Sequence, residues 1–137
     1  MSHILLCLIA FVANKSVAST VQSLVLFVGY PRSAHTIVGS ILDAHPNVAI
    51  VHEGSIVEHA HSFSNQTVLV DFIVQRAAQQ HVDGRWQTGF SYAIKGAWQG
   101  QQKSPLMVVG DKKGGATSAL LAADWDGTMA NIDHLRG

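Results

Sequence analysis

Cysteine is almost absent from this sequence, because Cys7 is the only one among 137 residues. A single cysteine excludes an intrachain disulfide framework. Net charge is absent as well, since Lys+Arg 9 balance Asp+Glu 9. This balance gives no electrostatic reason to expect nucleic acid or an anionic membrane as a partner. Hydrophobic residues, by contrast, make up 47% of the chain, and they suffice at this length for the core of one domain but not two ordinary ones.

The N-terminus carries a short apolar run from Ile4 to Ala13. It is about half the length of a membrane-spanning helix, which needs about 20 apolar residues. Val17-Ala18-Ser19 follow with the small residues of a signal-peptidase site, although His3 is the only basic group before the run. Residues 1–19 are therefore either a signal peptide or an N-terminal extension packed on the core. The first alternative implies the secretory pathway (Golgi lumen or secretion), and the second implies the cytoplasm.

The pattern from residue 23 to residue 51 predicts a strand, a tight loop, a helix and a second strand. SLVLFVG, residues 23–29, is a continuous apolar run typical of a strand buried on both faces. In the following helix Ile37, Val38, Ile41 and Leu42 share one face, and Pro46 should end it near Ala44. The second strand covers residues 48–51. This order is one βαβ unit, which implies a parallel pair with a right-handed crossover.

The later part of the chain continues the alternation. We predict a helix over 67–80, a hairpin turning at Lys95-Gly96, a third buried strand over 106–109 and a helix over 116–123. The predicted fold class is therefore α/β, with a parallel sheet of the P-loop type flanked by helices over residues 20–137. Because three parallel strands are few for such a sheet, we expect a truncated, N-terminal half of a larger domain. An exposed sheet edge would favour dimerisation or poor solubility.

The loop between the first strand and the helix nearly matches a phosphate-binding motif. In the pattern G-x-x-x-x-G-K-[ST], Gly29 and Thr36 hold the outer positions, while Ala34 and His35 replace the second glycine and the lysine. A loop entering a helix binds anions through free N–H groups and the helix dipole. Arg32 adds a planar cation suited to phosphate or sulfate. The alternative is an ordinary turn in which Ser33 caps the helix.

The stretch FVGYPRSAHTIVGSILDAHPNVAIVHE resembles the nucleotide-binding start of the PAPS-dependent sulfotransferases, whose loop commonly reads P-[KR]-S-G-T-[ST]. The elements PRS and LDAHP with a following glutamate look most like the tyrosylprotein sulfotransferases. VVGDKKGG, after the third strand, is similar to segments of the wider family. The resemblance covers roughly residues 24 to 120.

The resemblance implies that the loop holds the 5′-phosphosulfate of PAPS (3′-phosphoadenosine 5′-phosphosulfate), the co-substrate, without a metal ion. Arg32 would contact the bridging and sulfuryl oxygens. The cofactor-binding residues implied by the family are Pro31, Arg32, Ser33, Ala34, His35 and Thr36. Ala34 departs from the family's glycine, and a positive φ at this position would cost about 1 kcal/mol.

The acceptor side is expected at the same edge of the sheet. Glu53 follows the second strand and Lys112 ends the third, and the carboxyl ends of parallel strands form a ligand crevice. The family places its catalytic glutamate at Glu53, which would take a proton from an acceptor hydroxyl on a carbohydrate, protein or small molecule. Lys112 would neutralise charge on the sulfuryl group. The alternatives are that Glu53 caps the next helical turn and that Lys112 is a solvated turn lysine.

Three functions compete at this point. The first is a PAPS-dependent sulfotransferase, with Glu53, Arg32 and Lys112 as catalytic residues. The second is a noncatalytic, truncated domain that binds an anion or nucleotide, and the third is a phosphotransferase, which lacks its lysine and metal ligands. No Arg and Ser pair for the 3′-phosphate occurs after Ala116, where Arg136 is the only arginine. We therefore expect no measurable transfer by this chain alone. The spacing of the histidines predicts no metal site.

Overall fold

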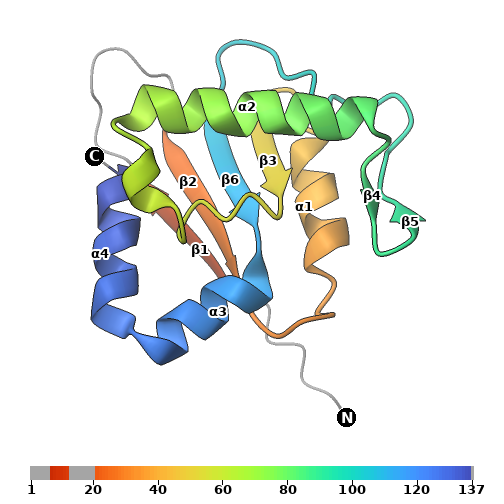
Figure 1. Cartoon of the computed structure of the whole chain (residues 1–137). Coiled ribbons are helices and arrows are strands. Elements are labelled where there is room, and N and C mark those ends of the chain that lie inside the picture. The colour runs from red at the N-terminus through yellow and green to blue at the C-terminus, as the bar shows by residue number, and fades with distance from the viewer. Residues whose placement is uncertain (1–6, 13–20, 137) are drawn as a thin grey trace.

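A four-stranded sheet organises the computed structural model of the chain, which describes residues 7–12 and 21–136 (Figure 1). Its order is β1 (Cys7–Val12), β2 (Ser23–Val28), β6 (Val108–Lys112) and β3 (Val48–His52). Strands β2, β6 and β3 run parallel, and β1 pairs antiparallel with β2. The predicted α/β class, a parallel sheet flanked by helices, is confirmed.

The two strands of the predicted βαβ unit are not neighbours. Strand β2, α1 (His35–Asp43) and β3 follow one another in the chain, but β6 lies between β2 and β3 and pairs with both. At the middle of this arrangement Gly110 lies beside Val25 and Ile50, and a Cβ at Gly110 would come within 2.4 Å of the Val25 carbonyl oxygen. A glycine therefore allows the three backbones to approach at the centre of the sheet.

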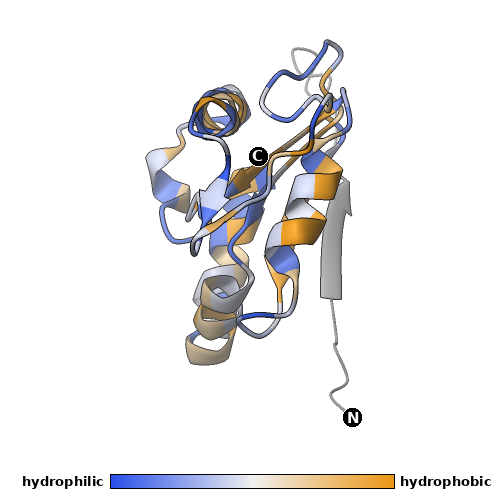
Figure 2. Cartoon of the chain, turned by 90° about the vertical axis from the view of Figure 1, so that its right-hand side faces the viewer, coloured by the Kyte–Doolittle hydropathy of each residue, from blue (hydrophilic) through white to orange (hydrophobic). Residues whose placement is uncertain are grey.

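Helices cover both faces of the sheet, and the hydrophobic strands lie between α1 and α2 (Gln66–Val82) (Figure 2). Alternation along β2 divides the core. Leu24 and Leu26 join the larger cluster with residues of α2 and α4 (Trp125–Arg136), whereas Val25 and Phe27 pack toward α1. The short helix η1 (Ala60–Ser62) contacts α4, and α3 (Gly114–Ala123) follows β6 directly and packs on β2 and α4.

A small hairpin follows α2, and its turn is not the predicted one. Strands β4 (Trp86–Gln87) and β5 (Phe90–Ser91) are joined by Thr88-Gly89, with φ of 49° and 84°. Two positive φ values are the signature of a type I′ hairpin turn. Lys95-Gly96 instead forms a turn within the loop that follows, closed by a hydrogen bond from Ala97 N–H to the Ile94 carbonyl.

The outer edge of β3 is closed by side chains. The Ile50 N–H donates to Asp43 Oδ1 at 2.6 Å, and the His52 N–H donates to Gln80 Oε1 at 3.0 Å. Arg85 and Gln80 in turn donate to the carbonyls of Ile50 and His52. An exposed sheet edge was expected at the third strand or at a neighbour of it. The third strand, β6, is central, and its neighbour β3 forms the edge. Bonding along β3 removes four of the backbone groups that would recruit another strand, and dimerisation stays a prediction.

The N-terminal apolar run contributes strand β1, whose register runs from Cys7 opposite Val28 to Val12 opposite Ser23. The suggested cleavage site at Val17-Ala18-Ser19 lies outside the described residues. Cleavage therefore stays a prediction. Within residues 7–12 and 21–136, none of the helices has the length and hydropathy to cross a membrane.

Candidate anion-binding site

The loop between β2 and α1 has a strained backbone. Arg32 and Ala34 both have left-handed conformations, with φ of 65° and 61°. Only glycine adopts this region freely, and strain of this kind concentrates at ligand sites. The sequence analysis expected a cost if position 34 had a positive φ, and Ala34 does have one. Gly29, at the start of the loop, is held by α3, since its N–H donates to Ser118 Oγ at 2.7 Å.

Helix α1 begins without a side-chain cap. Its N-cap residue is Ala34, and no side chain accepts a hydrogen bond there. The Ser33 hydroxyl donates instead to the Tyr30 carbonyl, so the alternative of a capping Ser33 is wrong. The N–H groups of a first helical turn have no partner within the helix. An anion is therefore a suitable partner for the start of α1.

These residues line a pocket of about 690 Å³. The loop and the start of α1 form one wall with Pro31, Arg32, Ala34, His35, Thr36 and Ile37. Glu53, Lys112 and Lys113 at the ends of β3 and β6 form a second wall, and Gly114, Gly115 and Ala116 at the start of α3 extend it. The structure thus brings together every predicted site residue except Ser33, which is not among the lining residues. We call this cavity the loop pocket.

Lys112 and Glu53 form an ion pair in the loop pocket. Lys112 Nζ lies 2.5 Å from Glu53 Oε1, and the exposed fractions of the two side chains are 4% and 45%. The Lys112 carbonyl also accepts a hydrogen bond from the Glu53 N–H at 3.1 Å. Glu53 has a φ of 57° and caps no helix, so the capping alternative is wrong. Lys112 is buried, so it is not the solvated turn lysine of the other alternative.

Asp111 fixes the segment that carries Glu53. Its buried carboxylate accepts hydrogen bonds from the N–H groups of Gly54 at 2.8 Å and Ile56 at 3.1 Å. Burial raises the pKa of Asp111 to about 6, against the lowering effect of these two hydrogen bonds. The neighbouring Lys113 donates to Ser55 and to Glu58, at 2.8 Å from the latter.

His35 is buried although it lines the loop pocket. Its ring packs edge-on against Phe27, with centroids 6.0 Å apart, and it lies beside Gly114, where a Cβ would be only 2.4 Å away. Burial, and then the charge of Lys112, lower the pKa of His35. The imidazole is therefore neutral at pH 7 and adds no cation to the loop.

The β4–β5 hairpin supplies lining residues that were not predicted to belong to the site: Gln87, Thr88, Phe90 and Tyr92. In the sequence, Phe90 and Tyr92 are not distinguished from one face of an ordinary hairpin, so they were not predicted as site residues. Trp98 does not line the loop pocket, and Lys103 Nζ lies 4.1 Å from the centroid of its ring.

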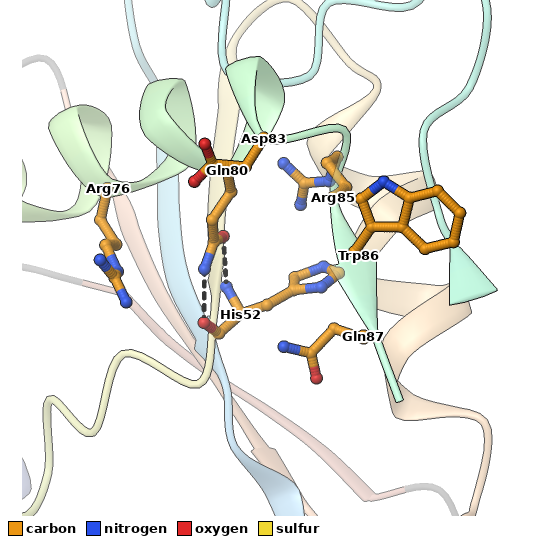
Figure 3. Close-up of a pocket in the computed structure, with 7 residues that line it drawn as sticks. All are labelled: His52, Arg76, Gln80, Asp83, Arg85, Trp86 and Gln87. Atoms are coloured by element: carbon orange, nitrogen blue, oxygen red, sulfur yellow. Dashed lines mark hydrogen bonds between the residues drawn. The ribbon is translucent and has the colours of Figure 1, made fainter. Parts of the chain in front are cut away.

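His52 does not join the loop pocket. It lines a second, smaller cavity between β3, the end of α2 and β4 (Figure 3). Adjacent residues at a strand end point to opposite sides, and the structure separates the side chains of His52 and Glu53 into the two cavities in this way.

Among residues 7–12 and 21–136, no group of three or more His, Cys, Asp or Glu side chains is placed to hold a metal ion. Comparisons of the chain with models of known protein families, with curated proteins and with solved structures find no match.

Proposed function

We propose that this chain is a PAPS-dependent sulfotransferase that binds the co-substrate in the loop pocket and transfers its sulfuryl group to an acceptor hydroxyl. The proposal is based mainly on one observation. The strained loop and uncapped start of α1, Arg32, Lys112 and Glu53 all line one cavity. The sequence resemblance to this family assigned a role to each of them.

The loop pocket suits a nucleotide in size and chemistry. Its volume of about 690 Å³ falls within the range of about 300–1,000 Å³ usual for small-molecule sites. One wall offers the N-terminus of α1 and the exposed guanidinium of Arg32 to the phosphosulfate. The segment around the β4–β5 hairpin offers Phe90 and Tyr92, whose rings could contact the adenine.

The two side chains of the ion pair differ in exposure, and this difference suggests separate roles for Lys112 and Glu53. Lys112 is almost fully buried, with Nζ beside Glu53 Oε1, and would stabilise negative charge on the oxygen that links sulfur to the 5′-phosphate. Glu53 is partly exposed and would accept a proton from the acceptor. An acceptor oxygen would then bond to sulfur while the bond from sulfur to the bridging oxygen breaks. Adenosine 3′,5′-bisphosphate would leave, with the acceptor proton on Glu53.

The 3′-phosphate has no assigned partner. Arg136 lies on α4, where it donates to Asp133 Oδ1 at 2.9 Å, and it does not line the loop pocket. This point favours the second function considered from the sequence, a domain that binds the nucleotide without turnover. Only a transfer assay separates that function from a sulfotransferase.

The test is transfer of radiolabelled sulfate from PAPS to a panel of hydroxyl acceptors. Glu53→Gln keeps the size of the side chain but cannot accept the proton, so turnover should fall at least about 100-fold, the lower range of a general base. Affinity for adenosine 3′,5′-bisphosphate should change by less than about threefold. Glu58→Gln is the matched control, because Glu58 does not itself line the pocket, although its partner Lys113 does.

Wild-type turnover that survives in Glu53→Gln would remove Glu53 from the catalytic role. The lack of a partner for the 3′-phosphate is the reason why no measurable transfer by the chain alone is expected from the sequence. Nucleotide binding by the wild-type chain without transfer to any acceptor in the panel would therefore replace the proposal with the noncatalytic function.

A further inference from the structure

The second cavity, about 190 Å³ in volume, is separate from the loop pocket (Figure 3). We call it the edge pocket, because it lies beside the outer edge of β3. Its lining residues are His52, Arg76, Gln80, Asp83, Arg85, Trp86 and Gln87. Only Gln87 also lines the loop pocket. The volume corresponds to about six water molecules at about 30 Å³ each.

Two buried polar atoms on this cavity lack partners. His52 and Arg85 are each 2% exposed, and within the described part of the chain neither His52 Nε2 nor Arg85 Nε has a hydrogen-bond partner. Other polar atoms of the same two residues do form hydrogen bonds. The His52 backbone bonds to the Gln80 side chain, and Arg85 Nη1 donates to Asp43 Oδ2 at 2.7 Å. An unpaired buried polar atom is costly, so such atoms mark a place where a small polar partner would bind.

The charges on the edge pocket cancel. Arg85 is neutralised by its ion pair with Asp43, and Arg76 lines the same cavity as Asp83. Burial lowers the pKa of His52 to about 3, so its ring is neutral at pH 7. The edge pocket therefore has no net charge to attract an anion, in contrast to the loop pocket.

The lining offers both donors and acceptors beside a flat ring. Arg76, Arg85 and Gln87 can donate, Asp83 can accept, and the free nitrogen of His52 does one or the other according to tautomer. Trp86 is 64% exposed and gives the cavity an apolar wall. A hydroxyl group both donates and accepts, and the C–H face of a sugar ring packs on an indole. This combination fits a neutral, hydroxyl-rich molecule.

We propose that the edge pocket is a second ligand site, which binds a neutral polyhydroxylated group of the size of a monosaccharide. This inference goes beyond the proposed function and does not depend on it, because Gln87 is the only one of the residues that carry it that also lines the loop pocket.

The experiment is an NMR titration of the whole chain with glucose, galactose, mannose and N-acetylglucosamine, without nucleotide. At least one sugar should shift the His52 ring and Trp86 indole signals saturably. Trp86→Ala should weaken that binding about tenfold, the effect of removing an aromatic anchor. Trp98→Ala, which removes a tryptophan outside both cavities, should change it less than about twofold.

Three results would overturn the proposal. One is the absence of a saturable shift with any of the four sugars, and another is equal affinity of wild type and Trp86→Ala. The third is saturation of the His52 signal by inorganic sulfate in place of sugars, which would make the cavity an anion site. Adenosine 3′,5′-bisphosphate is titrated separately, so failure of the nucleotide site leaves the sugar result intact.

Discussion

The outer edge of β3 and the carboxyl edge of the sheet use charged residues in opposite ways. Along β3, Asp43 and Arg85 are fully buried, face each other at 2.7 Å and satisfy the backbone of the strand. At the carboxyl edge, Arg32 is exposed, Ala34 and Glu53 are strained, and no side chain caps α1. Substitutions at the first region should therefore reduce stability, whereas substitutions at the second should reduce ligand binding.

The largest effect is expected from Asp43→Ala. Removing this carboxylate leaves Arg85 as an unpaired buried charge and the Ile50 N–H without its acceptor, so stability should fall by about 3–5 kcal/mol. Urea denaturation measures the change. Asp133→Ala is the matched control, because it breaks an exposed pair with Arg136 and should cost less than about 1 kcal/mol. Equal losses in the two variants would contradict the structural role of the β3 edge.

The next largest effect is acid sensitivity caused by His52. Its pKa is 6.5 when unfolded and about 3 when folded, so the unfolded state binds the proton first as pH falls. Stability from this group is complete above pH 6.5 and is lost toward pH 3, by up to about 1.4 kcal/mol per pH unit. His52→Gln should therefore flatten the loss of stability between pH 6.5 and 4.5, as measured by denaturation at each pH.

Protonation of Asp111 has the opposite effect on folding stability to protonation of His52. Its pKa is 3.8 when unfolded and about 6 when folded, so the folded state binds the proton first and acid favours folding between these values. Asp111→Asn removes this compensation and should steepen the loss that His52 causes. Parallel pH profiles for wild type and His52→Gln would show that burial of His52 does not control acid sensitivity.

Much of the fold follows from local sequence signals. The apolar run at 23–28, the helix ending before Pro46 and the strand after it all lie where predicted, because each depends on neighbouring residues. The position of β6 between β2 and β3 was not predicted, since strand order depends on contacts across the whole chain. The hairpin turn was missed because Thr88-Gly89 is a less familiar type I′ pair than Asn-Gly.

The candidate site likewise has parts that local sequence signals predict and parts that depend on contacts between distant residues. Glu53 and Lys112 were placed together because the carboxyl ends of parallel strands share one edge. The partnership of Asp43 with Arg85 joins residues 42 positions apart, and the hairpin that adds Phe90 and Tyr92 reaches the pocket only through tertiary packing. No local pattern in the sequence encodes either contact.

The smallest effect is expected in the strained loop. Ala34→Gly should stabilise the chain by about 1 kcal/mol, because glycine adopts a φ of 61° without the cost borne by alanine. Ala78→Gly, inside α2, is the control and should destabilise by about 0.5–1 kcal/mol. Thermal unfolding compares the two variants. Destabilisation by both would mean that Ala34 is not strained.

Calorimetric titration with adenosine 3′,5′-bisphosphate tests the central claim most directly. Arg32→Ala should weaken binding by about 1.5–3 kcal/mol, the scale of a hydrogen bond to a charged group. Arg76→Ala removes the same kind of side chain from the edge pocket and should leave the affinity within about twofold of wild type. Binding that is lost in Arg32→Ala and kept in Arg76→Ala would support the loop pocket as the nucleotide site. Equal affinity in all three proteins, or no binding by wild type, would contradict it.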